Sequence, residues 1–150
     1  MIRFCYEQYS YIEVSGCISL RAERAFRLIG ATHLEIPLGF DKSLSILNSQ
    51  SKCEVIQNST GLSVEIISDS EFLIDCYKIK VLVRKDYLFH KKYGHVLVND
   101  EIFGEILITK RLLKFELVFN PRKPEHEVHL LTEPIAIAIL INTLNIDGSF

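Results

Sequence analysis

One uncharged stretch near the end of the chain constrains the fold more than any other feature. Residues 134–146 carry no charged side chain, and seven of these thirteen residues are Ile or Leu. Thr132 suits the N-cap position and Gly148 suits the C-terminal cap, so we predict a hydrophobic helix over about 133–147. Because a surface helix keeps one polar face along its length, we expect this helix to be surrounded by the rest of the fold.

The same stretch is too short to serve as a membrane anchor. It falls below the ~20 apolar residues that a helix needs to cross a bilayer, so we expect no transmembrane segment. The N-terminal residues also lack the charged start and uninterrupted apolar run of a secretory signal. Together these observations favour a cytoplasmic location.

Short segments of alternating apolar and polar residues, separated by turn residues, dominate the chain before this helix. Residues 113–119 are the most regular example, because Leu113, Phe115 and Leu117 alternate with charged neighbours. This pattern is typical of antiparallel strands, and we count about ten or more of them. The sequence therefore predicts a mainly β (β-rich α+β) domain over residues 1–150, an antiparallel barrel or sandwich packed around the C-terminal helix.

Three segments carry more specific expectations. Arg21–Ile29 has apolar residues at helical spacing, which predicts a short helix. The segment Phe72–Arg84 is too long for one flat strand, and we predict a strand that bends near Tyr77 or Lys78. The segment His126–Leu131 predicts a final strand before the helix.

The composition is that of a folded domain without a dominant charge. The chain has 150 residues, of which 48% are hydrophobic and 24% are charged, with a net charge of −2. These values are typical of one globular core and argue against a nucleic-acid coat. The four cysteines contain no CxxC pair, so we expect buried free thiols rather than a zinc site.

Motifs for catalysis and for metal binding are missing from the sequence. It has no glycine-rich phosphate loop, no GxSxG turn and no acid cluster spaced for magnesium. The segment His126–His129 does not match the HExxH zinc pattern, and neither His90 nor His95 has a carboxylate at a fixed spacing. We therefore predict no catalytic residue, no metal and no cofactor.

Basic residues are concentrated in one part of the chain. Residues 78–123 hold eleven of the seventeen Lys and Arg against five acids, a local charge of +6 that leaves −8 elsewhere. Such a region can hold phosphates, with tyrosines that stack or insert at an interface, or it can form the solvent faces of separate strands. The candidate binding residues are Arg84, Lys85, Tyr87, His90, Lys91, Lys92, Tyr93, Lys110 and Arg111.

Two stretches resemble the tubby C-terminal-like superfamily, which includes the LURP-one-related proteins. They are Val98–Ile106, which is similar to the family's turn followed by a glycine in the next strand, and the apolar run Ile135–Asp147. The resemblance implies a closed barrel of about a dozen strands around a hydrophobic helix. It also implies, for some members, a basic lipid-binding face, although no residue-level motif transfers that face to this chain.

Three hypotheses for the function follow. The first is a non-enzymatic cytosolic domain that binds a protein partner or an anionic, phosphorylated lipid headgroup through an exterior basic and aromatic surface. The second is a nucleic-acid or nucleotide-binding module that uses the same residues. The third is a small hydrolase whose site is assembled from residues distant in sequence. The sequence leaves the oligomeric state open.

Overall fold

The computed structural model describes residues 1–7, 11–27, 31–49, 52–85, 91–111 and 114–144. Within these ranges the chain forms twelve strands followed by one helix. They are β1 (Ile2–Glu7), β2 (Tyr11–Gly16), β3 (Leu20–Arg27), β4 (Ala31–Pro37), β5 (Ser43–Asn48), β6 (Cys53–Asn58), β7 (Val64–Ile66), β8 (Glu71–Ile74), β9 (Tyr77–Lys85), β10 (Lys91–Val98), β11 (Glu101–Arg111), β12 (Lys114–Pro121) and α1 (Glu125–Thr143).

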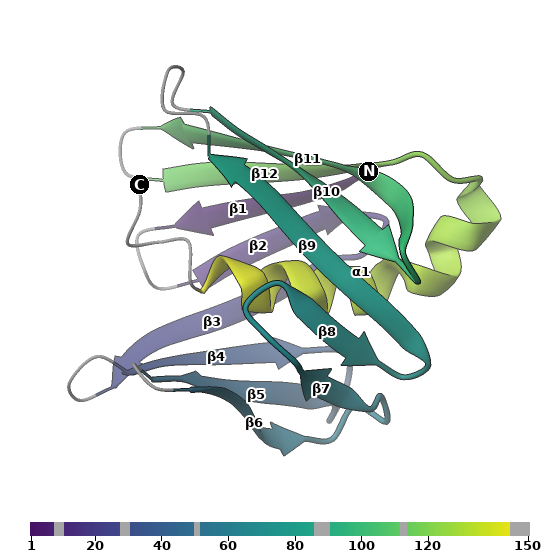
Figure 1. Cartoon of the computed structure of the whole chain (residues 1–150). Coiled ribbons are helices and arrows are strands. Elements are labelled where there is room, and N and C mark those ends of the chain that lie inside the picture. Colours follow the sequence, from purple (N-terminus) through teal and green to yellow (C-terminus); the bar gives the residue numbers. More distant parts are fainter. Residues whose placement is uncertain (8–10, 28–30, 50–51, 86–90, 112–113, 145–150) are drawn as a thin grey trace.

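The strands form a single antiparallel sheet that curls into a nearly closed barrel (Figure 1). The strand order is β6-β5-β4-β3-β2-β1-β12-β11-β10-β9-β8-β7. Most neighbours are consecutive in the chain, but β1 also pairs with β12, where Ile2 lies opposite Phe119. The sheet ends at β6 and β7, which are not hydrogen-bonded partners, so the barrel keeps a seam between these two strands.

Alternation along most strands separates the interior of the barrel from its surface. On β1, Ile2 and Phe4 are fully buried, whereas Arg3 points outward and forms an ion pair with Glu116 of β12 at 3.3 Å. Buried side chains from the strands meet those of α1 in one hydrophobic core. This arrangement confirms the prediction of a mainly β fold packed around a C-terminal helix, and the fold is a barrel rather than a sandwich.

The helix runs through the barrel, as Figure 1 shows in yellow. Every residue from Pro134 to Leu144 is buried, so the uncharged stretch is surrounded as its composition requires. Among the described residues, no helix combines the length and the apolar character that crossing a bilayer requires.

The start of the helix differs from the prediction. Helix α1 begins at Glu125 after Pro124 in the N-cap position, so the expected strand over His126–Leu131 is wrong and Thr132 is not a cap. Thr132 lies inside the helix and donates a hydrogen bond to the carbonyl oxygen of Val128 at 2.8 Å. Buried residues at 128, 131, 132 and 135 follow helical spacing. The prediction of a strand over His126–Leu131 does not take this spacing into account. The expected cap at Gly148 lies outside the described residues.

Two other local predictions are wrong. The expected helix over Arg21–Ile29 is largely strand β3, because pairing with β2 and β4 on both sides overrides a weak helical pattern. Arg24 is buried in this strand, and an interior arginine hides the alternation. The expected long strand Phe72–Arg84 is two strands, β8 and β9, because Asp75 takes a left-handed conformation (φ 53°) that turns the chain.

The cysteines only partly follow the prediction. All four are free thiols, as expected. Cys5 and Cys53 are partly buried in strands, whereas Cys17 and Cys76 are exposed because they lie in turns between strands.

Candidate functional site

Two predicted site residues lie opposite each other on the outer face of the barrel. Arg84 of β9 is the register partner of Tyr93 of β10, and Tyr93 is in turn opposite Leu107 of β11. Arg84 is exposed and Tyr93 keeps 49% of its surface exposed. Directly opposite residues of an antiparallel pair have side chains on the same face, so these groups form one surface.

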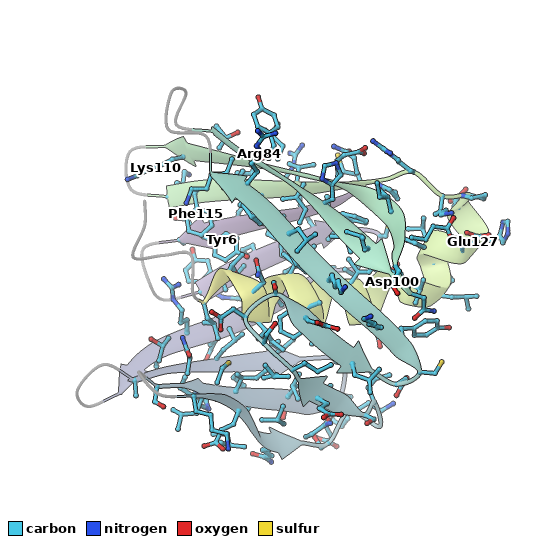
Figure 2. All side chains as sticks on the ribbon, in the orientation of Figure 1. Tyr6, Arg84, Asp100, Lys110, Phe115 and Glu127 are labelled. Carbon is cyan, nitrogen blue, oxygen red and sulfur yellow. The ribbon has the colours of Figure 1, made fainter. Side chains whose placement is uncertain are left out.

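Leu82 extends this surface. It lies two residues before Arg84 on the same face of β9, and 46% of its surface is exposed. We call the group of Leu82, Arg84, Tyr93 and Leu107 the Arg84–Tyr93 patch. Figure 2 shows Arg84 toward the end of β9, on the upper side of the barrel in that view.

Lys92 and Lys110 do not belong to this patch. Lys92 precedes Tyr93 in β10, so it lies on the other side of the strand, and only 8% of its surface is exposed. It is opposite Ile108, which is fully buried. Lys110 is exposed at the end of β11, near the barrel end at which the helix also ends (Figure 2). The structure therefore leaves Lys92 and Lys110 outside the surface that Arg84 and Tyr93 form.

The remaining predicted residues are placed only in part. Tyr87 and His90 lie outside the described residues. The backbones of the other three are in strands, and their side chains are not described: Lys85 is opposite Lys92, Lys91 is opposite Thr109, and Arg111 is opposite Lys114.

Several cations of region 78–123 are paired with acids. Lys78 and Lys80 of β9 approach Asp100 at 3.3 and 3.4 Å. A hydrogen bond and the charge of Lys78, followed by those of Lys80, lower the pKa of the Asp100 carboxyl. Asp100 follows Asn99 in a two-residue turn in which both residues have positive φ (66° and 51°). This turn holds the acid between the two lysines.

Three further pairs lie on the outer surface of β11 and β12 or beside it. Lys114 approaches Glu7 at 3.6 Å. Arg122 pairs with Glu105, and Lys123 pairs with Glu101. Acids are thus interleaved with the cations, and this part of the barrel is a mixed surface. Among the described residues, Arg84 forms no ion pair.

Neither the histidines of α1 nor the pocket beside Cys5 extends the candidate site. His126 and His129 are three residues apart on helix α1, so they lie on one side of it. Within the described ranges, no group of three or more His, Cys, Asp or Glu side chains converges. A pocket of about 100 Å³ lies beside Cys5, Glu7 and Phe115. It is smaller than the ~300–1,000 Å³ of pockets for drug-sized ligands.

Leu82 and Leu107 belong to the patch but are not among the binding residues that the sequence predicts. Alternation places Leu82 on the same face as Lys80 and Arg84, so the signal for a mixed apolar and basic surface was present in β9. The neighbourhood of Leu107 and Tyr93 depends on the pairing register of β10 with β11, which spacing within one strand does not reveal.

Comparisons with family models, with curated proteins and with solved structures found no match to this chain. The resemblance to the tubby C-terminal-like superfamily therefore stays a prediction.

Proposed function

We propose that this chain is a non-enzymatic binding domain of the cytosol that recognises a protein partner through the Arg84–Tyr93 patch. One observation carries the proposal: Arg84 and Tyr93 are exposed, lie opposite each other on adjacent strands, and are flanked by the exposed side chain of Leu82.

The chemistry of the patch suits a protein interface. Tyr and Arg, with Trp, are enriched among the residues that dominate binding energy, and they act best beside apolar neighbours that exclude water. Leu82 and Leu107 supply such neighbours. The partner surface that fits offers an apolar group to Tyr93 and a carboxylate to Arg84, because an arginine binds a carboxylate through two parallel hydrogen bonds.

Ion pairing in region 78–123 supports a protein partner over a lipid headgroup or a nucleic acid. Both of the latter ligands bind mainly through clusters of cations. Lys78, Lys80, Lys114, Arg122 and Lys123 each have an acid within 4 Å. Phosphates that approach these lysines and arginines therefore also meet carboxylates.

Membership of the tubby C-terminal-like superfamily is part of the same proposal. The described part of the chain forms a barrel of twelve strands around a C-terminal helix, which agrees with the architecture that the resemblance implies. Binding at the outer surface also suits a barrel whose interior is occupied by its own helix, because the interior then offers no space to a ligand.

A site-specific photocrosslinker tests the proposal. A benzophenone amino acid in place of Tyr93 is expected to capture a partner protein in cells, and Arg84→Glu in the same chain is expected to abolish this crosslink. Tyr11 offers a matched control on the outer face of β2 and β3. The centroid of its ring lies 3.8 Å from the guanidinium carbon of Arg21, so it is also a tyrosine beside an arginine. The same crosslinker in place of Tyr11, in a chain that also carries Arg21→Glu, is expected not to capture that partner.

Vesicle binding separates the lipid alternative from the proposal. We expect the purified protein to bind neutral and anionic vesicles equally weakly. Tight, Arg84-dependent binding to anionic vesicles, or a crosslinking pattern that is the same at Tyr93 and Tyr11, would overturn the assignment of a protein partner to this patch.

A further inference from the structure

A phenylalanine is almost fully exposed in the turn between β4 and β5, residues 38–42, which we call the Phe40 turn. Phe40 keeps 93% of its surface exposed, the largest fraction among the exposed large hydrophobic residues of the described ranges. Turns favour Gly, Pro, Asn, Asp and Ser, so the turn itself gives no reason for an aromatic residue at its apex. An aromatic side chain gains much from burial, which in the folded chain requires contact with another molecule.

Backbone geometry fixes the Phe40 turn. The Leu38 N–H donates to the Lys42 carbonyl oxygen at 2.8 Å, which closes the loop. Gly39 and Asp41, on either side of Phe40, both have positive φ (118° and 59°), which glycine adopts freely and aspartate more readily than most residues. A turn that is ordered before contact loses less conformational entropy on binding, so it is suited to present a side chain to a partner.

The charged neighbours of Phe40 are available for a contact. Asp41 and Lys42 are both exposed, and among the residues that the structure describes neither forms an ion pair. The Phe40 turn thus presents an apolar ring directly beside a carboxylate. These are the two groups that the Arg84–Tyr93 patch requires of its partner, an apolar group for Tyr93 and a carboxylate for Arg84.

The Phe40 turn and Arg84 lie toward opposite ends of the barrel. Neighbouring strands pair antiparallel, and β4 and β9 are an odd number of places apart in the strand order, so they run in opposite directions. The turn follows the C-terminal end of β4, and Arg84 is the second-last residue of β9. Figure 1 shows that α1 starts at the end that carries the turn, whereas β9 ends toward the other side. The short closed turn cannot reach the patch of its own copy, so a contact between them joins two molecules.

We propose that the partner of the Arg84–Tyr93 patch is a second copy of this chain, which binds through its Phe40 turn. Phe40 of one copy packs beside Leu82 and Tyr93 of the other, and Asp41 pairs with Arg84. This inference rests on the proposed function, because it names the partner of the same patch. The contact joins two unlike surfaces, so it repeats head to tail from copy to copy.

Sedimentation velocity of the purified protein tests the inference. The sedimentation coefficient is expected to rise with protein concentration up to about 1 mM, because a small interface gives weak, reversible association. Phe40→Ser and Arg84→Glu are each expected to abolish this rise. Asp41→Asn keeps a residue that tolerates positive φ and removes only the charge, so it is expected to weaken the association by about threefold.

A control variant and a mixing experiment define the contact. Leu130→Ser is the matched control, because Leu130 keeps 72% of its surface exposed on the first turns of α1, at the same end of the barrel, and it is expected to leave the association unchanged. The Phe40→Ser chain keeps its patch, and the Arg84→Glu chain keeps its turn. An equimolar mixture is therefore expected to form a 1:1 complex, although neither variant associates alone. This complex also shows that both variants are folded.

The inference and the proposed function can fail separately. Absence of self-association, association that survives Phe40→Ser, a mixture that stays monomeric, or an equal loss with Leu130→Ser would overturn the inference. Vesicle binding that Phe40→Ser abolishes would also overturn it, because the turn would then contact a membrane. Arg84-dependent capture of a different protein by the benzophenone in place of Tyr93 would overturn the inference and leave the proposed function standing. Absence of any Arg84-dependent capture would overturn both.

Discussion

The Tyr6 hydroxyl lies 2.8 Å from the Thr143 hydroxyl oxygen, which joins the first strand to the last turn of the helix across 137 residues of sequence. Thr143 lies 3.0 Å from the Leu140 carbonyl oxygen and donates its only hydroxyl hydrogen to it, so Tyr6 is the donor in the contact between the two hydroxyls. The Tyr6 ring also stacks on Phe115 of β12, with centroids 4.0 Å apart (Figure 2). One side chain thus connects β1, β12 and α1.

Replacing Tyr6 with Phe is expected to lower the free energy of unfolding by about 1 kcal/mol, the usual net contribution of a buried hydrogen bond. The stack on Phe115 remains possible, so the barrel should still fold. Urea denaturation would measure the loss, which corresponds to about 2–4 °C in Tm for a chain of this size. Tyr11→Phe on the outer face serves as the control, and an equal effect of both substitutions would contradict the role of the hydrogen bond.

Tyr6 also predicts a dependence on alkaline pH. Burial raises the pKa of the Tyr6 hydroxyl above its ordinary value, and the charge of Arg24 only partly opposes this. The unfolded chain ionises near pH ~10 while the folded chain keeps its proton, so stability is unaffected below that pH and falls above it. Melting curves above pH ~10 should therefore show a steeper loss for the unaltered protein than for Tyr6→Phe. Parallel curves would contradict the prediction.

The buried helix should not tolerate a charge. Ile139 is fully buried, and an unpaired carboxylate there costs several kcal/mol against a total stability of roughly 5–15 kcal/mol. We expect Ile139→Asp to prevent cooperative folding, as judged by thermal melting monitored by circular dichroism. Leu130 lies on the same helix with 72% of its surface exposed, so Leu130→Asp should melt cooperatively near the temperature of the unaltered protein. Cooperative melting of Ile139→Asp would mean that the helix is not part of the core.

Asp100 should titrate below the usual range of a carboxyl group. Its pKa is lowered by the hydrogen bond and charge of Lys78 and then by those of Lys80. A lowered pKa in the folded state means a stabilising contribution that is present above the ordinary carboxyl pKa and is lost as pH falls through the folded value. A titration followed by NMR should show the Asp100 pKa rising in Lys78→Ala, whereas Lys52→Ala, at a distant pair, should not change it. Added salt should also raise the Asp100 pKa, because salt screens the charges of the lysines at this exposed site.

The four cysteines should differ in their rates of alkylation. Burial, and then the charges of Asp69 and Glu54, raise the pKa of the Cys53 thiol to about 11, so its reactive thiolate is scarce at mildly alkaline pH. Iodoacetamide is expected to modify the exposed Cys17 and Cys76 first, as measured by mass spectrometry of peptides. Asp69→Asn should speed the reaction of Cys53, and Glu125→Gln should not. Equal rates at Cys17 and Cys53 would contradict the prediction.

Sequence by itself determined the two main features of this protein. Alternating apolar and polar residues predict strands, and the uncharged stretch before Asp147 predicts a buried helix. Each pattern indicates which side chains are buried on folding, because apolar side chains are more stable away from water. The absence of a polar face on that helix also required a fold that surrounds it. These inferences depend on neighbours within one segment, which a single sequence displays directly.

Only the tertiary structure decided the pairing of β1 with β12, the strand conformation of β3 and the seam between β6 and β7. It also separated Lys92 from Tyr93, which are adjacent in the chain but lie on opposite sides of one strand. The reason is physical: register and strand order arise from contacts between segments that are distant in sequence, and spacing within one segment carries no information about them. The Arg84–Tyr93 patch and the seam between β6 and β7 are both products of such contacts.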